Sequence, residues 1–391
     1  MRSRSCCLIL DPEAVRSGYH VHLADPRSPL RCWSLRTCNP EHRRASWTFS
    51  RSWNRRQGKI RCPNRPFPQL QRRNRAKRRD NLQSVPSDLT KDRARKPLTP
   101  GMTSVTTIRR ATCRANGIRQ FYLEAGAGPP IVLLHGFPET SFAWRFQIPA
   151  LAPHYRVIAP DLRGYGETDK PPNGYDKRTM ANDIVELLKT LGVGRVALIG
   201  HDRGARVATR LVKDHPDLVD RLVVMDNVPT RIVAREMTAK VAREYWFFMF
   251  HQIPDLPEAL IAGREDIWLR HFFSDWCHDP MTISGEAFET YVKSYSAPGA
   301  VRGAMSDYRA SAEDIAQDLE DAEQKIRRPV LSLWGEDFGA VGRLFDMKAV
   351  WSEMAETLSV APIERCGHLP QEEQPEAVNK LLLDFLKGWN G

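Results

Sequence analysis

Short apolar runs that alternate with helical patterns restrict the fold of this chain more than any other feature of its sequence. The runs are rich in Val, Ile and Leu, as expected of buried strands, and fall at residues 131–134, 156–159, 196–199, 222–225 and 330–334. Amphipathic helical patterns occur at 182–191, 204–215 and 375–389. Apolar strands separated by helices are typical of a mostly parallel sheet with helices on both faces. The sequence therefore predicts an α/β fold whose chemistry lies beyond the carboxyl ends of the strands.

Residues 230–327 interrupt this alternation, because they are rich in aromatic residues and mostly helical in period. A helical insertion between two late strands would lie over their carboxyl ends as a lid, exclude water and supply pocket walls. We therefore expect a core made of residues 102–229 and 328–391, with a helical lid at 230–327.

Positive charge is concentrated in residues 1–101, which hold 24 of the 58 Lys and Arg residues but only 7 of the 47 Asp and Glu residues. Residues 102–391 thus carry 34 basic and 40 acidic side chains, so no nucleic-acid partner is expected for the folded part. Apolar positions in 1–101 are too sparse to offset the entropy of folding. Three interpretations compete: a basic nucleic-acid arm, an organellar transit peptide, or a non-native extension before a start at Met102, which we favour.

Cysteine usage and hydropathy limit the cellular location. Cys113, Cys277 and Cys366 are the three cysteines after residue 101, and their spacing fits neither a disulfide framework nor a zinc site. The sequence has no apolar run of about 18 residues, and the apolar stretch at 6–10 is too short for a secretory signal. We therefore expect a cytoplasmic protein without a membrane span, a metal or an organic cofactor.

The strongest local motif is Gly-His-Asp-Arg-Gly at residues 200–204, between an expected strand and an expected helix. A Gly-x-nucleophile-x-Gly turn of this kind is sharp, needs small flanking residues and lifts its central side chain to the top of the sheet. Asp202 stands where esterases have Ser. A glycine-rich corner with an N-capping Asp is the alternative, but partners that follow in the right order favour a nucleophile.

Those partners are a histidine and an acid. His368 lies in a Gly-His-x-Pro loop just before the last expected helix and is the candidate base. Asp226 directly follows an expected strand and is the preferred acid, while Asp337, after the next strand, is the reserve. Together with Asp202 they form an expected triad of nucleophile, base and acid.

Four motifs give the chain, over about residues 118–390, a resemblance to the α/β-hydrolase superfamily. They are His-Gly-Phe-Pro-Glu-Thr at 135–140, Asp-Leu-Arg-Gly-Tyr-Gly at 161–166, the turn at 200–204 and Gly-His at 367–368. With Asp202 as nucleophile, the chain resembles epoxide hydrolases and haloalkane or haloacetate dehalogenases in particular. The resemblance implies a covalent ester on Asp202, hydrolysed by water that His368 activates and Asp226 helps to orient. It also implies that the backbone N–H groups of Phe137 and Arg203 stabilise the oxyanion.

Arg203 and Arg206 narrow the expected substrate. Their i, i+3 spacing on the first helical turn places both side chains on one face, where they would bind a substrate carboxylate and lower the pKa of Asp202. The alternative is that these arginines form salt bridges with nearby acids on the surface. Haloacetate dehalogenases use such an Arg pair, whereas epoxide hydrolases usually have Trp at the position of Arg203. The sequence therefore favours dehalogenation of a small 2-halo acid, with water as co-substrate.

The expected lid departs from the dehalogenase pattern. Alignment on residues 256–258 places Trp246 and Phe247 where those enzymes have a His-Trp pair that binds the departing halide, and Tyr291 fits the family tyrosine. Phe247 has no hydrogen-bond donor, so fluoride would be poorly supported as a leaving group. Chloro- and bromo-acids, or another substrate that bears a carboxylate, remain open.

Two other functions remain as alternatives. An epoxide hydrolase would use lid tyrosines, Tyr245 and Tyr291, to protonate the opening oxygen. A non-catalytic ligand-binding module on the same fold would not need the intact set of Asp202, His368 and Asp226. The sequence leaves homodimer formation open.

The composition of residues 1–101 generates the first testable prediction. A chain that begins at Met102 should keep the melting temperature and the activity of the full chain, because the removed residues carry too little apolar surface to pack on the core. Thermal unfolding and turnover of the two chains, measured side by side, check this. A clear loss of either would show that residues 1–101 dock on the folded part.

Overall fold

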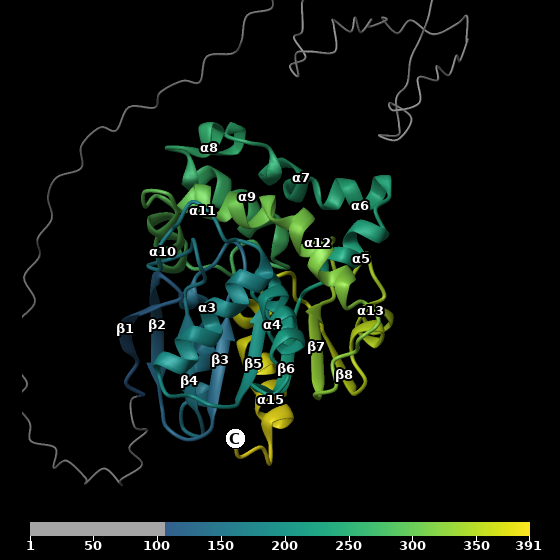
Figure 1. Cartoon of the computed structure of the whole chain (residues 1–391). Helices are drawn as coiled ribbons and strands as arrows, with labels where there is room; N and C mark the ends of the chain where they lie inside the picture. Colours follow the sequence, from purple (N-terminus) through teal and green to yellow (C-terminus); the bar gives the residue numbers. More distant parts are fainter. Residues whose placement is uncertain (1–105) are drawn as a thin grey trace, which may run out of the picture. The chain divides into compact units, whose positions relative to one another are not determined.

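One eight-stranded sheet organises the computed structural model, which describes residues 106–391 (Figure 1). The predictions for residues 1–101 and the boundary at residue 102 lie outside the described residues. The strand order is β1-β2-β4-β3-β5-β6-β7-β8. Strands β3 to β8 run parallel, whereas β2 pairs antiparallel with both β1 and β4. The predicted α/β class with a mostly parallel sheet is confirmed.

The five strands expected from the apolar runs are all present. They are β3 (Pro130–Leu134), β4 (Arg156–Pro160), β5 (Val196–His201), β6 (Val219–Met225) and β7 (Val330–Gly335). The remaining three were not predicted: β1 (Arg109–Ala115), β2 (Ile118–Ala125) and β8 (Leu358–Ile363). Strand β1 is largely exposed and β8 lies at the opposite edge of the sheet, so neither has the continuous apolar run of a central strand.

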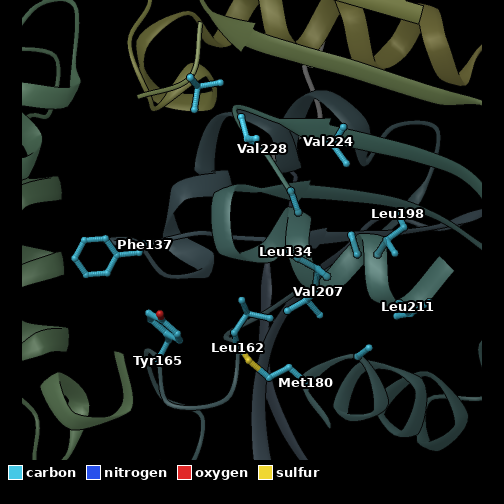
Figure 2. Close-up of a cluster of buried hydrophobic side chains, with 14 of the residues drawn as sticks. Leu134, Phe137, Leu162, Tyr165, Met180, Leu198, Val207, Leu211, Val224 and Val228 are labelled. Atoms are coloured by element: carbon cyan, nitrogen blue, oxygen red, sulfur yellow. The ribbon is translucent and has the colours of Figure 1, made fainter. Parts of the chain in front are cut away.

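Alternate residues of each central strand face opposite sides of the sheet and enter two separate cores. In β3, Val132 and Leu134 pack in the core that contains α3 (Lys177–Thr190) and α4 (Asp202–Asp214). Ile131 and Leu133 pack in the core on the other face, which contains α2 (Gln147–Leu151) and α15 (Pro375–Leu386). Figure 2 shows part of the first core around Leu134. Because burial of each such side chain contributes about 1.5–3 kcal/mol, both faces hold β3 firmly.

A helical segment separates β6 from β7, within the range where the sequence predicts the insertion. Figure 1 shows these helices together at one end of the sheet. They are α5 (Thr230–Arg235), α6 (Ala239–Glu244), α7 (Trp246–Gln252), α8 (Leu256–Ile261), α9 (Glu265–Trp276), α10 (Gly285–Tyr295), α11 (Ala300–Arg309) and α12 (Ser311–Glu320).

Phe137, which follows β3, connects this helical segment to the sheet. Its ring makes edge-to-face contacts with Phe272 of α9 and Tyr308 of α11, with centroids 5.2 and 5.5 Å apart. Edge-to-face pairs of this kind are worth about 0.5–1.5 kcal/mol beyond the area that they bury. The helices are therefore packed directly on the loops at the carboxyl ends of the strands.

The rest of the chain completes the outer layers. The remaining helices are the 3-10 helix η1 (Ser141–Phe146), α13 (Met347–Met354) and α14 (Pro370–Glu373). Between residues 106 and 391, no helix is both long and apolar enough to cross a membrane.

Candidate active site

Asp202 stands at the tight turn between β5 and α4. Its φ of +43° lies in the left-handed region, which a residue with a Cβ seldom adopts. Close packing on both sides requires glycine: a Cβ on Gly204 would lie 2.3 Å from the carbonyl oxygen of Leu134, and one on Gly200 would lie 2.6 Å from that of Gly204. The turn predicted from the motif is therefore formed, and Asp202 projects from the carboxyl end of the central strand.

The structure brings the three predicted triad residues together from distant parts of the chain. Asp226 directly follows β6, and His368 lies in the loop between β8 and α14. The Nδ1–H of His368 donates a hydrogen bond to Oδ2 of Asp226, and Nε2 of the same ring lies 4.0 Å from Oδ2 of Asp202. The imidazole of His368 therefore lies between the two carboxylates. Its Nδ1 faces Asp226 and its Nε2 faces Asp202.

Asp226 is held in place by the next strand. Its Oδ1 accepts a hydrogen bond of 3.1 Å from the backbone N–H of Gly335, at the end of β7. Burial raises the pKa of Asp226, and the hydrogen bond from His368 opposes this rise.

Asp337, the reserve acid, lies elsewhere. Its carboxylate binds His278 and Arg343 instead of His368. The reserve assignment therefore has no geometric support.

Several groups around Asp202 favour its ionised form. Burial alone would raise its pKa, but electrostatic interactions with His368, His201, Arg206 and Arg203 outweigh burial and lower the pKa below its usual value. The backbone N–H of Phe137 donates a hydrogen bond of 3.1 Å to Oδ2 of Asp202. The predicted oxyanion donor Phe137 thus already contacts the carboxylate.

Arg203 is buried, and part of its guanidinium is fixed by an ion pair. Its side chain is 1% exposed, and its Nε and Nη2 donate to the two carboxylate oxygens of Asp307, at 3.0 and 2.7 Å. Asp307 also accepts hydrogen bonds from Tyr165 and Lys177. The third nitrogen of Arg203, Nη1, is buried and has no hydrogen-bond partner among residues 106–391.

Arg206 differs from Arg203 in having no carboxylate partner. The residue is 7% exposed, and its Nη1 donates to the hydroxyl of Thr230. Its Nε is buried without a hydrogen-bond partner, and within the described part of the chain no carboxylate oxygen lies within 4 Å of the guanidinium. Its positive charge acts at longer range, where it lowers the pKa of Asp202 and opposes the rise that burial causes in the pKa of Asp318.

A small cavity connects these groups with the helical segment. The core contributes the triad residues and both arginines to its walls. The helices between β6 and β7 contribute five aromatic residues, which are Tyr245, Phe247, Phe248, Trp276 and Tyr308. Across residues 106–391, no group of three or more His, Cys, Asp and Glu side chains is placed to hold a metal ion.

Two residues expected at the halide pocket lie outside this cavity. Trp246 is 42% exposed and stacks on Phe272, away from the cavity walls. Tyr291 is fully buried, and its hydroxyl donates to Glu372 instead of facing the cavity. Both assignments were made by aligning the lid sequence with the family pattern. Which aromatic residue faces the cavity depends instead on how each helix is rotated and packed, and the alignment does not give this.

Sequence reasoning missed Tyr308 and Trp276 as cavity residues. Neither the Tyr308 hydroxyl nor the Trp276 indole N–H makes a hydrogen bond to another of the described residues, and the same holds for the Tyr245 hydroxyl. The guanidinium of Arg203 stacks on Tyr308, with 4.5 Å between Cζ and the ring centroid. Tyr308 therefore lies beside one of the two arginines that are expected to bind a substrate carboxylate. No local pattern separates Tyr308 from Tyr291, because both lie on the buried face of an amphipathic helix.

Comparisons with known proteins identify the family to which the fold belongs. A family model described as the alpha/beta hydrolase fold matches residues 129–375. A soluble epoxide hydrolase of Corynebacterium sp. (strain C12) is 39% identical over 72% of this chain and 98% of its own length. A fluoroacetate dehalogenase of Burkholderia sp. is 36% identical over 67% of this chain and 88% of its own length. Among solved structures, the epoxide hydrolase CorEH without ligand matches 72% of this chain and 99% of its own, with 38% identity and a TM-score of 0.68.

Proposed function

Because this chain belongs to the alpha/beta hydrolase fold family and is a hydrolase, we propose that it dehalogenates a small 2-halo acid through a covalent ester on Asp202. In the first step a carboxylate oxygen of Asp202 attacks the carbon that bears the halogen, the carbon–halogen bond breaks, and the halide leaves with the bonding electrons. The product of this step is an ester between Asp202 and the acid.

In the second step water hydrolyses the ester. His368 takes a proton from the water, whose oxygen attacks the carbonyl carbon of the Asp202 ester. Asp226 holds the ring and stabilises the imidazolium that forms. The Phe137 N–H donates to the oxyanion, and the backbone N–H of Arg203 is the second expected donor. When this intermediate collapses, the leaving oxygen takes the proton from the His368 imidazolium and a 2-hydroxy acid is released. The carboxyl group of Asp202 loses the remaining proton to solvent, which restores the carboxylate.

The observation that carries the proposal is the unused hydrogen-bonding capacity of the two arginines. Among residues 106–391, Nη1 of Arg203 and Nε of Arg206 have no hydrogen-bond partner, and the positive charge of Arg206 has no carboxylate within 4 Å. Both residues line the cavity together with Asp202. A substrate carboxylate would satisfy both donors and neutralise that charge. A neutral substrate would do neither.

Asp307 supports this carboxylate clamp, by which we mean Arg203 and Arg206 acting together on a substrate carboxylate. By binding Nε and Nη2 of Arg203 it fixes the plane of the guanidinium and leaves Nη1 as the free donor. Because the ion pair with Asp307 already offsets most of the charge of Arg203, Arg206 is the cation better able to attract a substrate carboxylate.

Epoxide hydrolysis is the second candidate, and the two cavity tyrosines favour it. Tyr245 and Tyr308 face the cavity with unpartnered hydroxyls, and burial raises the pKa of each, so both stay protonated and able to donate. Two such donors suit the oxygen of an opening epoxide. The pair differs from the expected Tyr245 and Tyr291, because Tyr308 takes the second place. The epoxide hydrolases among the relatives agree with this alternative.

The proposal includes the reactants and the location. The substrate and water are the reactants, with no organic cofactor. Cys113, Cys277 and Cys366 are free thiols, which supports a cytoplasmic location.

The mechanism predicts different outcomes for nucleophile and base variants. Asp202→Ala should abolish turnover, whereas His368→Gln should still form the ester and slow its hydrolysis by roughly 10²–10⁴-fold, the usual contribution of a general base. Mass spectrometry of the peptide that contains Asp202 should then show an added mass after incubation with substrate. Normal turnover by the His368→Gln protein would contradict the mechanism.

If Arg203 and Arg206 bind a substrate carboxylate, the effect of Arg206→Leu on kcat/KM should depend on whether the substrate carries one. A charge-assisted hydrogen bond is worth about 1.5–3 kcal/mol, so kcat/KM for a halo acid should fall by roughly ten- to a hundredfold. An uncharged haloalkane or epoxide of similar size should be affected little.

Arg210→Leu is the matched control for this measurement, because Arg210 lies one turn further along α4, pairs with Asp321 and does not line the cavity. It should leave kcat/KM per folded enzyme unchanged for both substrate classes. If Arg206→Leu is equally harmless, and neutral epoxides are good substrates, the carboxylate clamp is wrong and the epoxide reaction stands.

The epoxide alternative predicts a contrast between two tyrosines. Tyr308→Phe should lower epoxide turnover by roughly ten- to a hundredfold through loss of a hydrogen bond to a charged oxygen. Tyr291→Phe should leave turnover nearly unchanged, because its hydroxyl binds Glu372 outside the cavity. Steady-state diol formation by both variants checks the assignment, and a larger loss with Tyr291→Phe would return the role to that residue.

A further inference from the structure

One carboxylate holds the loop of His368 on both sides. Glu373 is the last residue of α14 and follows that loop in the chain. Its Oε1 accepts hydrogen bonds of 3.0 Å from the backbone N–H groups of Gly367 and Leu369, and the N–H of Gly367 lies equally close to Oε2. The two residues that flank His368 are therefore bound to the same side chain.

The same carboxylate binds the helical segment between β6 and β7. Its Oε2 accepts a hydrogen bond of 2.6 Å from the backbone N–H of His278, just after α9. The carbonyl oxygen of Trp276, at the end of α9, accepts a hydrogen bond of 2.8 Å from the backbone N–H of His368. A Cβ on Gly367 would lie 1.9 Å from that carbonyl oxygen, so the turn at 276–278 and the loop of His368 are in direct contact.

The turn at 276–278 also contacts the imidazole of His368. The ring of Trp276 lines the cavity and meets the imidazole edge to face, with 4.8 Å between centroids. The ring of Phe338, in the loop after β7, lies 4.5 Å from the imidazole. A shift of the turn would therefore move both the backbone acceptor of His368 and an aromatic ring that packs on its side chain.

The carboxylate of Glu373 is bound by backbone N–H groups alone. In the described part of the chain, no Lys, Arg or His side-chain nitrogen lies within 4 Å of it. Burial raises the pKa of Glu373, and the hydrogen bonds from Gly367, His278 and Leu369 oppose that rise. Hydrogen bonds from N–H groups to an ionised acceptor are stronger than those to a neutral one, so this group is well suited to hold the loop and the turn together.

We propose that Glu373 is a positioning residue for ester hydrolysis, because it joins the loop of His368 to the turn at 276–278 and thereby sets where the imidazole lies relative to Asp202. This inference rests on the proposed function, since it assigns Glu373 a role through His368. Glu373 itself does not line the cavity.

The two steps of the proposed reaction depend on this position to different degrees. Asp202 forms the ester without a base, whereas hydrolysis needs His368 to take a proton from water. Displacement of a reacting group by about 1 Å can cost on the order of a hundredfold in rate. Loss of the Glu373 carboxylate should therefore slow hydrolysis of the ester and spare its formation.

Rapid-quench kinetics of Glu373→Gln separate the two steps. Glutamine keeps the size of the side chain, but its NH₂ group would face N–H donors in place of one oxygen. With chloroacetate or with styrene oxide, mass spectrometry of the peptide that contains Asp202 follows the ester over time. The rate constant of hydrolysis should fall by roughly ten- to a hundredfold and that of formation by less than about threefold, so that the ester accumulates.

Glu376→Gln is the matched control, because Glu376 is exposed on the first turn of α15. It should change neither rate constant. A merely structural loss in Glu373→Gln would lower both rate constants together, and equal falls or an unchanged rate of hydrolysis would overturn the proposal. The absence of an ester in His368→Gln with either substrate would instead refute the proposed function, and this role with it.

Amide hydrogen exchange tests the contact without any substrate. In the full chain, the N–H groups of Gly367, Leu369 and His278 should exchange roughly tenfold faster in Glu373→Gln than in the wild type, because the carboxylate that accepts from them is gone. Glu376→Gln should leave their exchange unchanged. Wild-type exchange rates at all three groups in Glu373→Gln would overturn the proposal, whichever reaction the enzyme catalyses.

Discussion

The left-handed backbone of Asp202 is the constraint on which the rest of the site depends. A non-glycine residue in this conformation costs on the order of 1–3 kcal/mol, so the surroundings must enforce it. They do so because β5 lies in the middle of the sheet with both faces buried, and α4 packs so closely that only glycine fits at positions 200 and 204. The packing energy of the core thus maintains a carboxylate in a position that the local chain would not choose.

With Asp202 in this position, the site also requires that the charges buried around it be compensated. Cations at the start of α4 oppose the helix dipole, so Arg203 and Arg206 need compensation from elsewhere. Asp307 of α11 supplies it for Arg203, which also anchors the helical segment to the core. Arg206 forms no ion pair within the described part of the chain, and its charge acts on Asp202 and Asp318 only at longer range.

The sequence reveals most of what the sheet determines and little of what the helical segment determines. Central strands have strong apolar runs, and residues that follow them, such as Asp226, meet at one edge of the sheet. The β1–β2 hairpin was missed although Asn116-Gly117, a turn with positive φ at both residues, was a readable signal. Tyr308 was not readable, because its place in the cavity depends on the packing of α11 against α4 and Phe137, which no local period encodes.

The two candidate reactions share a nucleophile and a base, and they differ in how many negative charges the cavity must accommodate. An opening epoxide develops one negative charge, on oxygen, which Tyr245 and Tyr308 are able to bind. A halo acid brings a carboxylate and also releases a halide, and the same donors can serve the halide. Only the carboxylate makes use of the free N–H groups of Arg203 and Arg206. An epoxide would leave these N–H groups without a hydrogen-bond acceptor, so the hydrogen-bonding capacity of the site favours the acid as the proposed substrate.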